Sequence, residues 1–533
     1  MDEKRKPLSK NLSDTGKSHT FARQIKNKKA RVTDDKHTCM RSGMTLPRLL
    51  LLLAEVIVFA VLAVATSSHF GMADGARITG ALLVAYLVPR LILTRARATS
   101  TTAIVILLLL TALLMWINYR RLAGWTFFDG YSLQEPNIGG DGRGFYKWAF
   151  LRYYGRPEDF PVVYPGFPVL MLALWKVFGV NVVWPVAMNT MFTLTSVVLT
   201  GMTTRRLLSW RVSARPETLL WGGMALSCLL IYYFIMGTAI LKEASIFISV
   251  AMAGYALAAM GADDKERHHP WRDIILFVVA CLLLGLVRTT FLYFIALGVV
   301  VMLLGHPRRD WRVSLAMLGI VALSLFLGNL FSSYSFDRHA EIAGGGWNMQ
   351  RFFVVGDSRS FYHELLNYYF LYPAWHKALM LPLTLSVQFI IPLPWTYYET
   401  ASTFNVLCRM TYGWYVVGGI SLFYFLYVSW HRNGNMGAWP WWAALCYVAL
   451  AYVMAGSVAR YVTPVQPLFV PVAMYVLCRL WEGHWRKAFI WWSVIFVILM
   501  AAALVLCLEI QQATISKMLH TRSLVHYWKG IPY

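Results

Sequence analysis

The chain has 533 residues, of which 58% are hydrophobic and only 14% are charged, and its formal net charge is +23 at pH 7. Soluble proteins carry about 25% charged residues, so the composition excludes an ordinary soluble globular protein. Apolar runs that approach the ~20 residues of a membrane-crossing helix recur along the chain. We therefore predict an all-α fold, a polytopic transmembrane helical bundle. The runs are too long and alternate too little for an outer-membrane barrel.

The positive charge is concentrated in residues 1–46, where twelve Lys and Arg face five Asp and Glu. This segment is poor in large apolar residues, so we predict a disordered basic tail on the cytoplasmic side that contacts anionic lipid. Apart from charge, nothing in it indicates nucleic-acid binding. The seven cysteines form no C-x-x-C pair and mostly lie in apolar runs, which is typical of small core residues.

With the N-terminus inside, the excess of Lys and Arg in cytoplasmic loops predicts about thirteen crossings (11–14) within residues 47–510, followed by a short tail at 511–533. Two apolar stretches, 162–179 and 377–395, are predicted to be interfacial or re-entrant, because counting either as a crossing would move arginine-rich loops outside. The predicted crossings are 47–67, 76–94, 102–118, 182–202, 217–240, 243–260, 272–288, 289–305, 312–331, 411–430, 437–456, 460–480 and 488–509.

This threading gathers charged residues on the outer face, in a first large loop (119–181), in a second outer region (332–410) and at helix ends. Charged groups at membrane depth are costly, so they are functional candidates. Arg and Lys suit a phosphate, a carboxylate suits a general base or a metal ligand, and the aromatic residues of the first loop suit sugar rings. The charged candidates are Asp129, Asp141, Lys242, Glu243, Arg288, Asp357, Arg359 and Arg460.

Each candidate also has a structural interpretation. Asp129 precedes Gly130, which is typical of a turn. Lys242 and Glu243 could cap a helical hairpin, and arginines at helix ends often extend to lipid headgroups. The motif G-D-x-R-x-F-Y occurs at 140–146 and again at 356–362, but the flanking residues differ, so an internal repeat is not indicated.

The stretch GDGRGFYKWAFLRYYGRPEDFPVVYPGFPVLMLALWKVFG (140–179) resembles the first outer loop of the GT-C polytopic glycosyltransferases, such as the protein O-mannosyltransferases and aminoarabinose transferases. The shared features are an acidic residue, an aromatic residue, and a Tyr-Pro-containing helix that ends in Phe-Gly. The resemblance implies a polyprenyl-phosphate-linked sugar donor, a glycan, lipid or protein acceptor, and Asp141 as the catalytic base. No cofactor is assigned, although a divalent metal could be held.

Further roles follow from the outer-face placement together with this resemblance. Asp129 and Asp357 are the alternative catalytic carboxylates. Lys242, Arg288 and Arg460 would bind the donor phosphate and stabilise the leaving group. The residues expected to line the substrate are Glu243, Tyr146, Tyr164, Arg143, Arg359 and His363.

We therefore predict a glycosyltransferase of cell-envelope polysaccharide biosynthesis, in the bacterial inner membrane with its active site on the outer face. Two alternatives stay open. An O-antigen or capsule polymerase or ligase would depend on basic residues of the second outer region, namely Arg351, Arg359 or His363. A lipid-linked glycan flippase would show paired repeats and charges near the midplane, and neither is evident.

Overall fold

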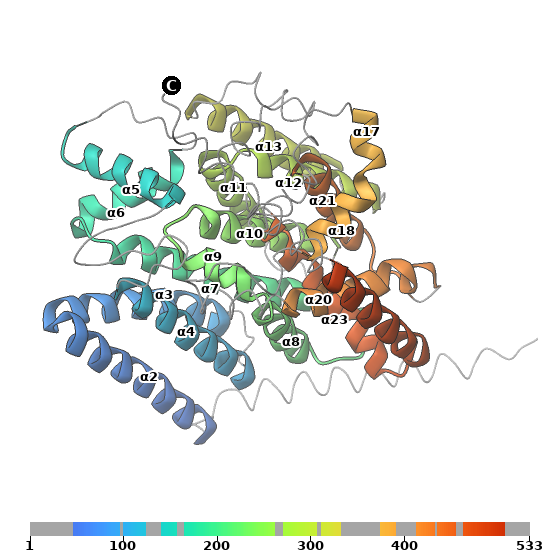
Figure 1. Cartoon of the computed structure of the whole chain (residues 1–533), viewed down its shortest axis with the longest axis horizontal. Coiled ribbons are helices and arrows are strands. Elements are labelled where there is room, and N and C mark those ends of the chain that lie inside the picture. Colours follow the sequence, from blue (N-terminus) through green and yellow to red (C-terminus); the bar gives the residue numbers. More distant parts are fainter. Residues whose placement is uncertain are drawn as a thin grey trace, which may run out of the picture. The chain divides into compact units, whose positions relative to one another are not determined.

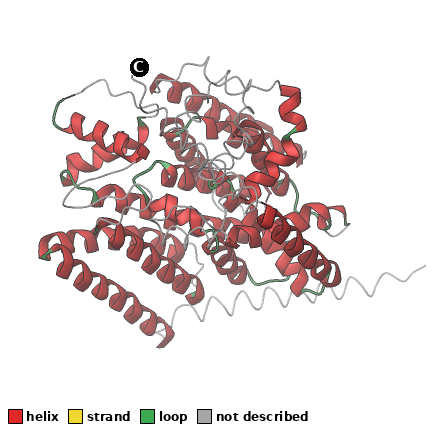
Figure 2. Ribbon diagram, in the orientation of Figure 1, coloured by secondary structure: helices red, strands yellow, loops and turns green. Residues whose placement is uncertain are grey.

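The computed structural model describes residues 46–95, 100–123, 140–156, 165–261, 270–305, 311–331, 374–390, 412–431, 434–454 and 462–506. These residues form α-helices and short 3-10 helices, and no β-strand occurs among them (Figures 1 and 2). The predicted all-α class is confirmed. The chain divides into two units, Met1–Ile57 and Val58–Tyr533. Only the opening turns of one helix are described in the first unit, and the helical bundle belongs to the second.

The helices of the first half are α2 (Leu46–Phe70), α3 (Met72–Arg95), α4 (Thr101–Leu122), α5 (Gly140–Tyr153), α6 (Gly166–Phe178), α7 (Val183–Leu208), α8 (Pro216–Cys228), α9 (Ile231–Thr238) and α10 (Glu243–Gly261). Those of the second half are α11 (Pro270–Val287), α12 (Thr290–Gly305), α13 (Trp311–Phe331), α17 (Ala374–Leu379), α18 (Leu381–Ile390), α20 (Tyr412–Leu426), η3 (Val428–Trp430), α21 (Trp439–Met454), η4 (Gln466–Phe469) and α23 (Val470–Trp481), followed by a last helix at Arg486–Leu506.

Eight of the described helices are long and apolar enough to cross a membrane. Each coincides with a predicted crossing, for example α2 with 47–67 and α13 with 312–331. The other five predicted crossings fall on helices that are not among these eight, most of which are shorter or interrupted. A multi-pass helical membrane protein is thus supported, whereas the count of 13 crossings is not confirmed.

Helices α7 and α10 form the core of the described bundle. Helix α7 packs against α3, α4, α8, α10 and α23, and α10 also packs against α11 and α12. Many α7 side chains are Thr or Ser, and their hydroxyls donate to the carbonyl one turn earlier, as Thr193 does to Asn189 O at 2.8 Å. Small hydroxyl residues satisfied in this way let helices approach closely without leaving unpaired polar groups in an apolar surrounding.

The predicted crossing at 217–240 is not one continuous helix, because two short helices occupy this segment. Helix α8 ends at Cys228, and α9 begins at Ile231. The intervening turn is held by the Leu230 N–H, which donates to Ser227 O at 3.0 Å. The start of α20 packs against this turn so closely that a Cβ on Gly413 would overlap the Leu229 carbonyl oxygen. The hydropathy of 217–240 is continuous and does not show this break.

We expect Gly413→Ala to destabilise the fold by about 1–3 kcal/mol, because the added methyl group meets backbone that cannot rotate away. Gly319→Ala is the matched control, since a Cβ on this helical glycine meets nothing within 4 Å. Alanine should there be neutral or stabilising by about 1 kcal/mol. Thermal unfolding in detergent measures both variants. Equal melting temperatures for the two would contradict the close packing at Gly413.

The two stretches predicted as interfacial or re-entrant are short helices in the structure. Helix α6 has 13 residues, and it buries Phe167, Met171 and Trp175 along one face. The stretch 377–395 contains α18 and part of α17, helices of 10 and 6 residues. The end of α18 lies within the protein, because the Trp414 indole donates to Phe389 O at 3.1 Å. None of these helices has the ~20 residues of a crossing.

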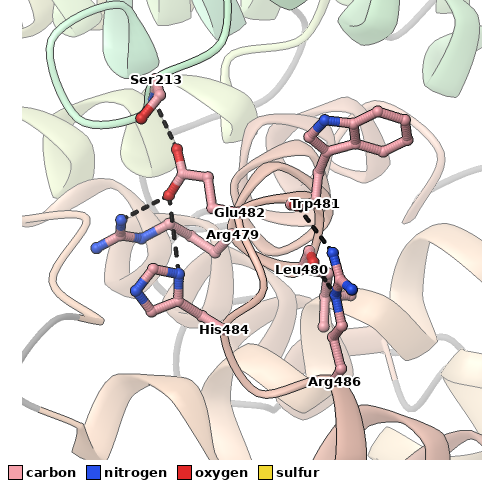
Figure 3. A network of polar contacts seen from close by, with 7 residues as sticks. All are labelled: Ser213, Arg479, Leu480, Trp481, Glu482, His484 and Arg486. Atoms are coloured by element: carbon pink, nitrogen blue, oxygen red, sulfur yellow. Dashed lines mark hydrogen bonds and ion pairs between the residues drawn. The ribbon is translucent and has the colours of Figure 1, made fainter.

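The arginine-rich loops predicted to share one side do lie together. The Ser213 N–H, in the loop between α7 and α8, donates to Glu482 Oε1 at 2.7 Å, just beyond α23 (Figure 3). Arg206 at the end of α7 forms a bidentate pair with Asp273 at the start of α11, at 2.9 and 2.7 Å. These contacts agree with the threading, because they join three segments that it assigns to the same side.

Candidate functional site

The site forms where the chain is not helical between α9 and α10. Residues 239–242 leave several carbonyl groups without helical partners, and side chains of neighbouring helices bind them. The Asn189 amide of α7 donates to Ala239 O at 2.5 Å and to Leu241 O at 3.0 Å. The Thr193 hydroxyl, whose proton is shared between Asn189 O and Gly237 O, lies 3.0 Å from the Gly237 oxygen in the last turn of α9. This interruption is therefore built into the fold, and it sets the position of the residues after it.

Arg121, at the end of α4, holds the same segment from the other side. Its side chain is 0% exposed. Nη1 donates to the Thr238 hydroxyl at 2.8 Å, and Nη2 donates to Ile235 O at 3.0 Å. A charged group at this depth is costly unless it is hydrogen-bonded, so Arg121 is a strong structural constraint on the end of α9.

Sequence reasoning missed Arg121, because the predicted crossing ended at residue 118. A signal was nevertheless present. Leu107, Leu114 and Arg121 are seven residues apart and share one helical face, and all three are buried. The neighbouring Arg120 is exposed. Helical spacing could therefore have indicated which of the two arginines points inward.

Lys242 is the last residue of the interruption, and Glu243 begins α10 directly after it. Glu243 is the first residue of α10 and is only 2% exposed. Its Oε2 atom has no hydrogen-bond partner among the described residues. Lys242 is half-buried, and its ammonium nitrogen lies 5.7 Å from the centre of the Phe145 ring on α5. The pair thus lies where the interruption approaches α5.

Helices α5 and α6 carry the aromatic part of the site. The Phe145 and Phe167 rings meet edge to face at 5.6 Å, and Tyr146 meets Trp175 at 5.0 Å. Burial raises the pKa of Tyr146 above its ordinary value, and the nearby Tyr154 adds to this rise. Tyr146 is therefore a neutral phenol at pH 7 and can donate a hydrogen bond.

Asp141 is the second residue of α5, which begins at Gly140. Its backbone lies in the first turn, where the helix dipole favours a negative charge, while its side chain lies outside the described part of the structure. Arg143, predicted to line the substrate, is exposed on α5.

Arg288 comes directly after the last turn of α11 and is 9% exposed. Its guanidinium carbon lies 5.8 Å from the centre of the Phe291 ring. The end of α11 touches the start of α6 so closely that a Cβ on Gly166 would overlap the Leu286 carbonyl oxygen. Arg288 therefore lies near the start of α6.

The remaining predicted site residues lie outside the described residues. They are Asp129, Tyr164, Asp357, Arg359, His363 and Arg460. In the part of the chain that is described, no group of three or more His, Cys, Asp or Glu side chains could hold a metal ion.

In comparisons with known proteins, the chain matches no protein-family model, no curated protein and no solved structure. The residues of the site are therefore the basis for assigning a function.

Chemically, the described part offers cations at the ends of apolar helices, a buried carboxylate, and aromatic rings beside a helix that begins with Gly-Asp. Such a set can bind a phosphate and present a hydroxyl compound to a carboxylate.

Proposed function

We propose that this protein is a membrane glycosyltransferase of the GT-C type. It moves a sugar from a polyprenyl-phosphate donor to a hydroxyl group of a glycan, lipid or protein acceptor, at the outer face of a bacterial inner membrane. Asp141 is the catalytic base in this proposal. Lys242 and Arg288 bind the donor phosphate, together with Arg460.

The observation that carries the proposal is the contact between Lys242 and Phe145. The Lys242 ammonium nitrogen is 5.7 Å from the ring of a residue only one helical turn beyond Asp141. Two segments far apart in the sequence thus combine a phosphate-binding cation with a helix that starts on an acidic residue. The cation can bind the phosphate of a lipid-linked donor, and the carboxylate can accept the proton of an acceptor hydroxyl.

The proposed reaction is a single displacement. The acceptor hydroxyl gives its proton to the Asp141 carboxylate, and the acceptor oxygen forms a bond to the anomeric carbon of the sugar. The bond from that carbon to the phosphate oxygen breaks, and its electron pair leaves with the polyprenyl phosphate. Lys242 and Arg288 stabilise the negative charge that develops on this leaving group.

The donor explains why such an enzyme would be embedded in a bilayer. Its lipid chain stays among acyl chains while its phosphate lies at the level of the helix ends. The short helices α6 and α18 are consistent with lateral access for the lipid, because neither is long enough to close the bilayer as a crossing does.

The test is transfer by the purified full-length protein in liposomes. One labelled sugar is offered on polyprenyl phosphate, on polyprenyl diphosphate and on a nucleoside diphosphate. We expect transfer from the polyprenyl monophosphate alone, with one polyprenyl phosphate released for each sugar moved. Movement of the intact lipid across the bilayer without release would contradict the proposal and indicate a transporter. Growth of a long polymer from the diphosphate donor would indicate the polymerase alternative.

A further inference from the structure

A second unusual arginine lies at the opposite end of α7, in the loop of residues 209–215. Arg211 is half-buried, and its guanidinium carbon stacks 4.2 Å above the Trp210 ring. Its charge is close to the buried Tyr424 of α20 and Tyr475 of α23. Burial lowers the pKa of Arg211 to about 10, which still leaves it positively charged at pH 7.

Part of the Arg211 guanidinium has no acceptor among the described residues. Nε and Nη1 are buried, and neither has a hydrogen-bond partner among the described residues. A buried donor of this kind normally has an acceptor, because leaving it unpaired costs about 1–3 kcal/mol. One face of the group is stacked on Trp210, so an acceptor can reach these donors only in the plane of the guanidinium, after a local shift of the side chains that cover them.

The nearby carboxylate is already engaged. Glu482 accepts from the Ser213 N–H with Oε1 and from Arg479 Nη1 with Oε2, both at 2.7 Å (Figure 3). Burial alone would raise the pKa of Glu482, but these hydrogen bonds outweigh it and leave the pKa below its ordinary value. Glu482 thus stays ionised and satisfied, and Arg211 needs a different anion.

The other charged residues around this loop are mostly basic. Arg486 donates to Leu480 O at 2.9 Å and to Trp481 O at 3.1 Å, which places its charge at the end of α23 (Figure 3). Arg215, Glu217 and Lys487 are exposed. Within the described residues, these groups leave a local excess of positive charge that attracts an anion.

Exposed tryptophans surround the basic residues. Trp481 is 88% exposed, Trp430 is 81% exposed and Trp210 is 49% exposed. Trp430 ends η3, and the adjacent His431 ring lies 6.3 Å from the Trp485 ring, beside the Glu482 turn. Tryptophan is enriched where a membrane protein meets the headgroup layer, so this end of the bundle is suited to lipid headgroups.

We propose that Arg211 binds the phosphate of an anionic phospholipid, with its guanidinium fork directed to the phosphate oxygens and Trp210 holding the fork in place. Arginine suits this task because its planar group binds phosphate in a bidentate manner while stacking on an aromatic ring. The site differs from the proposed donor site, since it lies at the other end of α7 and requires no transfer activity.

The test is the affinity of the full-length protein, purified in detergent, for single phospholipids, measured by native mass spectrometry. We expect phosphatidylglycerol to bind at least about tenfold more tightly than phosphatidylcholine. Arg211→Gln should weaken phosphatidylglycerol binding roughly tenfold to a hundredfold, because charge-assisted hydrogen bonds are lost. Arg215→Gln is the matched control in the same loop, and it should cost about fivefold or less, as an exposed charge near a headgroup does.

Arg211→Lys keeps the positive charge but lacks the planar guanidinium group. It replaces Arg211→Gln in the test if that variant does not fold. It should bind phosphatidylglycerol less tightly than the wild type. Unchanged affinity in the folded Arg211 variants would overturn the proposal and mean that the acceptor comes from the chain itself. Displacement of phosphatidylglycerol by millimolar inorganic phosphate would overturn the lipid assignment in favour of a free anion.

Discussion

Replacing Asp141 by Asn should lower the rate of sugar transfer by about 10²–10⁴-fold, which is the usual contribution of a general base. The amide keeps the size of the side chain but cannot accept the proton of the acceptor hydroxyl. Asp141 lies in the first turn of α5, where the helix dipole stabilises a carboxylate and not a neutral amide. The loss should therefore appear in kcat, with little change in the amount of donor bound.

Asp74→Asn is the matched control for this experiment. Asp74 is in the first turn of α3, as Asp141 is in that of α5, and it forms an exposed ion pair with Arg77 at 2.6 Å. An exposed pair contributes about 0–1 kcal/mol, so transfer should stay near the wild-type rate. Wild-type transfer by Asp141→Asn would show that another group is the base, and Asp129 and Asp357 would be tested next.

Replacing Lys242 by Met should lower kcat/KM for the polyprenyl-phosphate donor by about 10–100-fold. Met preserves most of the apolar stem that lies near Phe145, but it removes the ammonium group that would bind the donor phosphate. The expected loss corresponds to one or two charge-assisted hydrogen bonds. Measured donor dependence in the liposome assay separates a rise in KM from a fall in kcat.

Two variants make this result specific. Lys242→Arg keeps the charge and should retain most of the activity, whereas a purely structural lysine would not show this rescue by charge. Lys176→Met removes an exposed lysine of α6 and should leave donor use unchanged. If Lys242→Met used the donor as well as the wild type does, the phosphate would not be bound at the α9–α10 interruption.

Much of the helical framework could be predicted from hydropathy alone. Each of the eight long apolar helices coincides with a predicted crossing, because a bilayer requires about 20 apolar residues in a row. Charge bias also predicted that Ser213 and Glu482 would lie on one side, and the structure joins them by a hydrogen bond. Hydropathy did not reveal the break after Cys228, since it arises where α20 packs against the chain and leaves apolar character unchanged.

The site was only partly predictable for a related reason. A sequence shows that Lys242, Glu243 and Arg288 stand at helix ends, and the structure places Lys242 near Phe145. It does not show which way a side chain points. Arg121 and Arg211 each stand near other arginines in the sequence, yet Arg121 is fully buried and Arg211 is half-buried in the fold.

The sequence by itself determined that the protein is an all-helical membrane protein. Its long apolar runs are too costly to expose to water, and inside a bilayer the backbone of such a run has to satisfy its own hydrogen bonds by forming a helix. It also determined which charged residues stand at helix ends. Only the tertiary structure decided that α9 is separated from α10 and held by Arg121, Asn189 and Thr193. Those hydrogen bonds join segments 44 to 117 residues apart, so no local pattern encodes them.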